Sequence, residues 1–232
     1  MSTYKHLKTG RRFLFIHIPR TGGRFVEANL DSQGWVWDDN VDVDRQYKSV
    51  DGVEVAHFHR EYYEKHLDVK NIPHICIVRN PIDRFISASI YLKHLYGDDI
   101  QELMEDPVYF FSMLENYPCT ESVNWYRSQL DFLSDKTHIW KFEDGLGENF
   151  SEWLSDIVGV KIEMNQSVRY SKQDYESNKL DKTPALIDNI RQLYRKEIGQ
   201  LYPELATQLW ETSETKTKTT STQGAERSTA TV

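Results

Sequence analysis

The sequence has few cysteines and no long hydrophobic run. Only Cys76 and Cys119 occur among 232 residues, and Cys76 lies inside an apolar run, so neither a disulfide framework nor zinc-ligand spacing is present. No apolar stretch reaches the roughly 20 residues that a helix needs to cross a bilayer. Residues 1–12 are polar and basic, without the apolar centre of a signal peptide. We therefore expect a soluble, cytoplasmic protein with no membrane span.

Positive charge is also in short supply. The net charge of −8 disfavours a nucleic-acid-binding protein that relies on a basic face, although a local basic pocket is compatible with it. The length suits one domain, which we place at residues 1–210. Residues 211–232 are rich in Thr and Ser and almost free of apolar side chains. Such a segment cannot bury enough surface to offset its ordering entropy, so we predict a disordered tail there.

Short apolar runs alternate with longer segments of helical periodicity, which predicts an α/β fold with a mostly parallel central sheet flanked by helices. Asn80 before Pro81, and Thr183 before Pro184, are typical of helix N-caps followed by proline. The expected strands are Phe13–Ile18, Val53–Phe58, Ile72–Val78 and His138–Phe142. The expected helices are Gly23–Leu30, Pro81–Leu95, Pro107–Leu114, Cys119–Leu133, Gly147–Val158 and Pro184–Leu201.

The segment from Pro19 to Phe25 places a cation, a hydroxyl and two glycines between an expected strand and an expected helix. A helix N-terminus at the carboxyl end of a strand offers backbone N–H groups to a phosphate, and Arg20 can fork two hydrogen bonds onto its oxygens. Taken alone, the Gly22-Gly23 pair fits a plain tight turn with an exposed arginine better than a phosphate site. No Gly-Lys-Ser/Thr follows, so the segment is not a Walker A loop.

A second group of polar residues follows the strand that ends at Val78. Arg79 lies at the carboxyl end of that strand, and Ser87 lies about two turns into the next helix. The two side chains are placed to hold a second phosphate, at a distance from the first. Arg84 is expected on the helix surface, paired with Asp83 or another acid, and Asp83 itself suits the positive end of the helix dipole.

These two motifs together resemble those of sulfotransferases that use 3′-phosphoadenosine 5′-phosphosulfate (PAPS). The shared patterns are Pro-Lys/Arg-Thr-Gly-Gly after one strand and Arg-x-Pro-x-x-Arg-Phe-x-Ser after a later one. The sequence is most similar to carbohydrate sulfotransferases of the heparan sulfate 2-O type, and the likeness runs through much of residues 12–203. It implies a P-loop-like fold. It also implies a loop that binds the 5′-phosphosulfate, made by Arg20, Thr21, Gly22, Gly23, Arg24 and Phe25. The 3′-phosphate would be held by Arg79 and Ser87.

The sequence departs from this family at the 5′ loop. Lysine usually stands where Arg20 is, and arginine keeps the positive charge but is a poor proton donor. The small hydroxyl residues that usually follow the glycine pair are replaced by Arg24 and Phe25. Charge stabilisation by Arg20 and by the loop's backbone N–H groups is therefore expected, whereas general-acid catalysis by Arg20 is in doubt.

The candidate base is His57. The resemblance places a histidine between a small and an apolar residue, and Ala56-His57-Phe58 matches that context. An imidazole with an unperturbed pKa of about 6.5 suits removal of an acceptor proton at neutral pH. His59 is the alternative base, and in a strand it would share a face with His57. A metal site or a structural pair are the other interpretations of the two histidines, and His17 is expected to lie beneath the loop as a strand residue.

The resemblance thus predicts a metal-free sulfuryl transfer from PAPS to an acceptor hydroxyl, with a carbohydrate as the expected acceptor and with His57 and Arg20 as catalytic residues. One rival is a P-loop-type ATP-dependent kinase, for which Glu143 and Asp144 are the available magnesium ligands. The other is a non-catalytic glycan-binding protein. Trp35 and Trp37 are candidates for stacking on a sugar ring, although core packing suits them better, and Arg169 and Lys172 are candidates for closing over the donor.

Overall fold

A five-stranded sheet forms the centre of the protein. The computed structural model describes residues 2–38, 49–50, 53–96, 121–165 and 182–205. The sheet has the order β3-β1-β2-β6-β7, in which β2, β6 and β7 run parallel and β1 and β3 are antiparallel to their neighbours. The strands are β1 (Ser2–His6), β2 (Arg12–Ile16), β3 (Trp35–Trp37), β6 (His74–Val78) and β7 (Thr137–Lys141).

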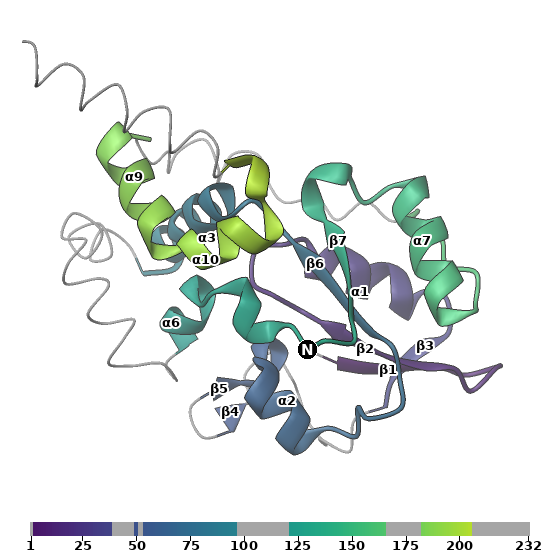
Figure 1. Ribbon diagram of the computed structural model, residues 1–232. Helices are drawn as coiled ribbons and strands as arrows, with labels where there is room; N and C mark the ends of the chain where they lie inside the picture. Colours follow the sequence, from purple (N-terminus) through teal and green to yellow (C-terminus); the bar gives the residue numbers. More distant parts are fainter. Residues whose placement is uncertain (1, 39–48, 51–52, 97–120, 166–181, 206–232) are drawn as a thin grey trace, which may run out of the picture.

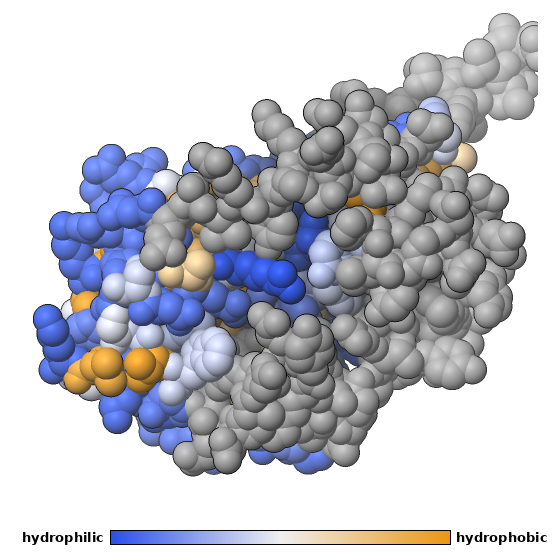
Figure 2. Space-filling view, turned by 180° about the vertical axis from the view of Figure 1, so that it is seen from behind, coloured by the Kyte–Doolittle hydropathy of each residue, from blue (hydrophilic) through white to orange (hydrophobic). Residues whose placement is uncertain are grey.

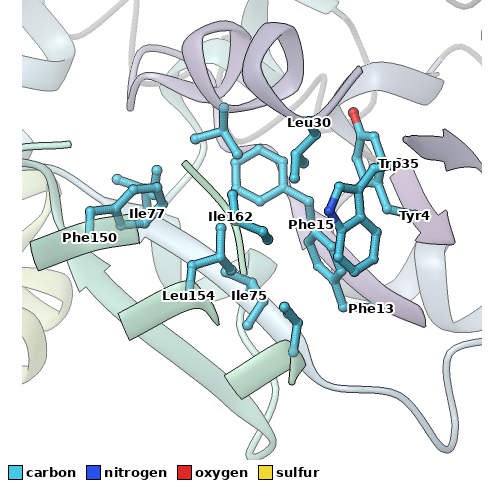
Figure 3. Close-up of a cluster of buried hydrophobic side chains, with 12 residues drawn as sticks. Tyr4, Phe13, Phe15, Leu30, Trp35, Ile75, Ile77, Phe150, Leu154 and Ile162 are labelled. Carbon is cyan, nitrogen blue, oxygen red and sulfur yellow. The ribbon is translucent and has the colours of Figure 1, made fainter. Parts of the chain in front are cut away.

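Strands β2 and β6 are buried on both faces of the sheet because the side chains in the middle of each strand are all apolar. Side chains alternate across a strand, so Phe13 and Phe15 of β2 enter one core while Leu14 and Ile16 enter the other. Figure 3 shows the first core, in which Phe13 and Phe15 lie near Trp35 and Leu30. Fully burying one such side chain stabilises the fold by about 1.5–3 kcal/mol.

Helices cover both faces of the sheet, which confirms the expected α/β class. Helices α1 (Gly23–Asp31) and α7 (Glu148–Val158) lie side by side over one face (Figure 1) and bury Leu30 and Leu154 against it. On the other face, Tyr63 of α2 (Arg60–His66), Phe132 of the 3₁₀ helix η2 (Gln129–Phe132) and Tyr202 pack on β2 and β6.

A separate helical cluster adjoins the sheet. Helices α3 (Pro81–Tyr96), α6 (Glu121–Tyr126), α9 (Pro184–Leu193) and α10 (Arg195–Leu201) gather around the buried side chains of Phe85, Trp125 and Ile198. Both predicted N-caps are confirmed, since Asn80 Oδ1 accepts from the N–H of Ile82 at 3.0 Å and Thr183 Oγ1 accepts from the N–H of Leu186 at 3.2 Å.

The predicted strand Val53–Phe58 is wrong in most of its length. Only β5 (Val53–Glu54) is extended, and it pairs with β4 (Ser49–Val50) outside the central sheet. Val55–His57 forms a 3₁₀ helix, η1, so His57 and His59 do not share the face of a strand. The expected helix over Cys119–Leu133 is two pieces, α6 and η2.

Strands β1 and β3 were not predicted from the sequence. Their buried aromatic residues, Tyr4 and Trp35, pack with Phe13. Within the five-stranded sheet only β1 runs against the other strands, since β3 is antiparallel to β1, so the sheet is mostly parallel as expected. Trp35 is a core residue, whereas Trp37 is about half exposed and donates from Nε1 to the Tyr4 hydroxyl at 3.0 Å.

Some of the predictions concern residues that the structure does not describe. These are the helix at residues 107–114, Cys119, Arg169, Lys172 and the tail at 211–232. None of the helices within the described ranges is long and apolar enough to span a bilayer. On the face in Figure 2, the described surface is mainly hydrophilic with small hydrophobic patches.

Candidate active site

The turn between β2 and α1 has an unusual backbone. Arg20 has a φ of 67° and Gly22 a φ of 93°, both in the left-handed region, which a residue with a side chain seldom occupies. The Thr21 hydroxyl holds the turn by donating to the carbonyl oxygen of Ile18 at 2.9 Å. Thr21 is buried, so its side chain serves the turn itself rather than the cavity beyond it.

Both glycines of the turn are required by close neighbours. A Cβ atom on Gly22 would lie 2.8 Å from Cδ1 of Leu146, and one on Gly23 would lie 2.1 Å from Cδ2 of His17. Gly22 also precedes the first turn of α1, whose leading N–H groups have no partner within the helix. The turn therefore brings the positive end of a nine-residue helix to the surface of a cavity, an arrangement that favours anions.

The cavity has a volume of about 630 Å³, which suits a small ligand. It lies at the carboxyl ends of β2, β6 and β7, the edge predicted from the sequence. Its lining comes from the turn and α1, from the segments after β6 and β7, and from α3, α6 and η1. The lining residues are His17, Pro19, Arg20, Gly22, Gly23, Arg24, Phe25, His57, Arg79, Ser87, Tyr91, Trp125, Phe142, Gly145 and Leu146.

The two sequence motifs meet in this cavity. Arg20 Nε donates to Ser87 Oγ at 3.0 Å, and Arg79 Nη1 donates to the carbonyl oxygen of Arg20 at 3.2 Å. The sequence predicted two phosphate sites at a distance from one another. The structure brings residues of the two motifs into direct contact, because Arg20 touches both members of the second motif.

Positive charge dominates the lining. Three guanidinium groups, from Arg20, Arg24 and Arg79, face the cavity, and no carboxylate is among the described lining residues. The Arg20 guanidinium lies 4.8 Å from the centre of the Tyr91 ring, and that of Arg79 lies 4.7 Å from the centre of the Phe142 ring. These aromatic contacts restrain the two arginines without neutralising them. A local basic pocket thus exists on a chain of net negative charge.

A hydrogen-bond network fixes the backbone at Arg79. The Gln129 side chain accepts from the Arg79 N–H at 2.9 Å and donates to the Arg79 carbonyl oxygen at 2.7 Å. Gln129 is in turn held by the buried carboxylate of Glu197, which accepts from Gln129 Nε2 at 2.6 Å. Arg79 therefore has a rigid base from which its side chain reaches the cavity.

His57 lines the cavity and His59 does not. The His57 ring lies 5.0 Å from the His17 ring and 5.6 Å from the Trp125 ring, in edge contacts. His59 is buried, and burial together with the charge of Arg127 lowers the pKa of its imidazole. Among the described residues its Nε2 finds no hydrogen-bond partner. The geometry thus favours His57 over His59 as the histidine that a ligand would meet.

His17 has a larger part than the sequence suggested. It lies beneath the turn, as predicted, but β2 ends at Ile16, so His17 is not a strand residue. Its ring also lines the cavity, and its Nδ1 is 3.1 Å from Oε1 of Glu27. Burial alone would raise the pKa of Glu27, but the charge and the hydrogen bond of His17 outweigh it and lower that pKa to about 2. Glu27 is therefore a carboxylate at neutral pH, one helical turn below the glycine pair.

The surface position expected for Arg84 is wrong. Its side chain is fully buried, and it donates to the carbonyl oxygens of Trp125 at 3.0 Å and Arg127 at 2.6 Å. Asp83 instead forms an exposed ion pair with Lys182 at 3.3 Å. Arg84 thus joins α3 to the end of α6, which contributes Trp125 to the cavity.

Glu143 is occupied by structural contacts. Its Oε1 accepts from the Asn80 N–H at 2.7 Å and its Oε2 accepts from the Tyr202 hydroxyl at 3.0 Å. Neither Glu143 nor Asp144 lines the cavity.

The lining residues that were not singled out as ligand contacts from the sequence include His17, Tyr91, Trp125 and Phe142. Tyr91 and Trp125 stack with ring centres 4.7 Å apart and planes within 6°. Only His17 carried a local signal, its place directly before the Pro-Arg-Thr-Gly-Gly turn. The three aromatic residues come from segments that the fold brings together, so periodicity gives no sign of their role.

Comparisons with known proteins add little to this geometry. No protein-family model matches the sequence, and a search of curated proteins finds no match. Among solved structures, the chain is similar to a sulfotransferase from Alicyclobacillus acidocaldarius, with 12% identity and a TM-score of 0.46. The match covers 83% of this chain and 95% of that one. At this identity and TM-score the likeness decides nothing about activity, which has to be argued from the cavity itself.

Proposed function

We propose that this chain is a sulfotransferase that moves a sulfuryl group from PAPS to an acceptor hydroxyl on a carbohydrate. The observation that carries the proposal is the contact between the two motifs, in which Arg20 donates a hydrogen bond to Ser87 close to the N-terminus of α1. A donor with phosphates at both ends needs two anion sites in one cavity, and PAPS is such a molecule.

The cationic groups are arranged to suit the two ends of this donor. Arg20 and the first N–H groups of α1 face the place where the 5′-phosphosulfate would lie, and Arg79 and Ser87 supply contacts for the 3′-phosphate. Negative charge builds on the 5′-phosphate as the bond from its oxygen to sulfur breaks. Fixed cations and N–H dipoles stabilise that charge without reorganising.

The acceptor would approach from the side of His57. Its oxygen attacks sulfur, the sulfur–oxygen bond to the phosphate breaks, and the acceptor proton passes to His57, leaving 3′,5′-adenosine bisphosphate. Tyr91 and Trp125, stacked on each other beside His57, give this side of the cavity an aromatic lining, which suits the C–H groups of a sugar ring. This aromatic lining is the reason for preferring a carbohydrate over an unbranched lipid acceptor.

The test is a transfer assay with labelled PAPS and a panel of sugars, phenols and amines. We expect label in the sugars, and its loss in His57→Ala with binding of 3′,5′-adenosine bisphosphate retained. His138→Ala, which removes an exposed histidine on β7, is the matched control and should keep full turnover. Unchanged turnover in His57→Ala would refute the base assignment.

Two other outcomes would favour a different function. Magnesium-dependent ATP turnover without PAPS activity would identify a kinase, and sugar affinity that survives loss of Arg20 and Arg79 would identify a non-catalytic glycan-binding protein.

A further inference from the structure

A carboxylate and two imidazoles form a row that ends in the cavity. Glu27 projects from α1 and its Oε1 is 3.1 Å from Nδ1 of His17. The His17 ring then meets the His57 ring at 5.0 Å between centres and 72° between planes. Both histidines line the cavity, whereas Glu27 lies behind them and is absent from the lining.

The hydrogen bond fixes the proton of His17. An ionised carboxylate can only accept a hydrogen bond, so Nδ1 of His17 carries the hydrogen and a neutral His17 keeps its lone pair at Nε2. The ring also packs against Gly23, where an added Cβ would be 2.2 Å from Nε2, and this close packing restrains its position. Glu27 therefore determines both the orientation and the tautomer of His17.

Glu27 also offsets the charge of the cavity. A cationic environment lowers the pKa of an imidazole, and a nearby anion raises it. Glu27 is close enough to His57 for the two to interact electrostatically. Asp31, one turn further along α1, is the neighbouring acid, and burial with the charge of Glu27 raises its pKa. Among the described lining residues, the other charged or titratable groups are Arg20, Arg24, Arg79 and Tyr91.

We propose that Glu27 is a positioning residue that acts through His17 to hold His57 in place and to stabilise the imidazolium that forms there. The proposal rests on the proposed function, in which His57 takes the acceptor proton. Glu27 neither gains nor loses a proton in the step. It contributes a fixed negative charge and a packed imidazole, which together favour the imidazolium form of His57 among three guanidinium groups.

The first test is the pH dependence of kcat/KM for sulfuryl transfer. In Glu27→Gln the acidic limb should move to lower pH by about one unit, and kcat on the plateau should fall about three- to tenfold. Glu27→Asp, which keeps the charge, should restore the limb to within about 0.3 unit. Glu64→Gln removes an exposed carboxylate that pairs with Arg60 on α2 and is the matched control, with no shift expected. If the acidic limb of the Glu27→Gln profile coincides with that of the wild type, the proposal is overturned.

The second test does not depend on activity, and its first readout needs only the wild-type protein. Long-range ¹H–¹⁵N spectra of the wild-type protein report which ring nitrogen of His17 carries the hydrogen. Hydrogen on Nδ1 supports the proposal, and hydrogen on Nε2 with a bare Nδ1 overturns it. The same spectra should show the pKa of His57 lower by about one unit in Glu27→Gln. If the wild type transferred no sulfuryl group, these spectra would still decide whether Glu27 controls the two histidines.

Discussion

Arg20 donates from Nε to Ser87 Oγ at 3.0 Å, although 67 residues separate them in the sequence. This bond joins the turn after β2 to helix α3, which begins after β6. The backbone of Arg20 is left-handed, at a cost of about 1–2 kcal/mol for a residue with a Cβ atom. The surrounding contacts hold Arg20 in this conformation, which suggests that its side chain is needed where the turn places it.

Replacement of Arg20 by alanine should weaken binding of 3′,5′-adenosine bisphosphate about 10- to 100-fold. The expected loss corresponds to one charge-assisted hydrogen bond, about 1.5–3 kcal/mol. Calorimetric titration measures it directly, and Arg60→Ala, which removes an exposed arginine on α2, serves as the control. A loss of less than about twofold in Arg20→Ala would remove Arg20 from the donor site.

Replacement of Gly23 by alanine should destabilise the fold by about 1–3 kcal/mol, because the new methyl group would overlap the His17 ring. The matched control is Gly199→Ala in α10, where an added Cβ meets nothing within 4 Å and alanine should be neutral or stabilising by up to about 1 kcal/mol. Urea denaturation of the two variants gives the comparison. If Gly23→Ala and Gly199→Ala have the same unfolding free energy, the His17 ring does not pack tightly against Gly23 in solution.

Replacement of Arg84 by methionine should cost about 2–4 kcal/mol of unfolding free energy. The change leaves the buried carbonyl oxygens of Trp125 and Arg127 without their donor. Arg195→Met, at an exposed position of α10, is the control for loss of an arginine. If both variants unfold at the same denaturant concentration, Arg84 does not join α3 to α6 in solution.

Glu27 should make stability depend on pH in acid. Its pKa is lowered from 4.5 to about 2 in the folded protein, so its contribution is fully present above about pH 4.5 and disappears as pH falls toward 2. The unfolding free energy of the wild type should exceed that of Glu27→Gln by about 3 kcal/mol at pH 6. The gap should close progressively in denaturant titrations between pH 4.5 and pH 2. A gap that is constant with pH would mean that Glu27 acts by packing alone.

The parts of the site that depend on neighbours in the sequence could be predicted. The apolar run before Pro19, the glycine pair and the Asn80-Pro81 step each mark a boundary through local chemistry, and α1 and α3 begin where these signals stand. The carboxyl-edge position of Arg20 and Arg79 followed from the same boundaries.

The parts that depend on distant contacts could not be predicted. Arg84 is buried because carbonyl oxygens 41 and 43 residues away point at it, and no local pattern reveals that. The segment around His57 alternates like a strand, yet Val55 and Phe58 are both buried, a spacing of three that fits the observed 3₁₀ turn. The contact of His17 with Glu27 depends on α1 folding back over the turn, so the carboxylate behind the histidine was missed.

The central claim is that one cavity holds a nucleotide phosphorylated at both ends. Calorimetric titration of the wild-type chain with 3′,5′-adenosine bisphosphate tests it most directly, with 5′-AMP as the ligand that lacks the 3′-phosphate. We expect saturable binding at micromolar concentrations, at least about tenfold weaker for 5′-AMP, with the difference between the two nucleotides lost in Arg79→Ala. No binding at sub-millimolar ligand, or equal affinity for the two nucleotides, would contradict it.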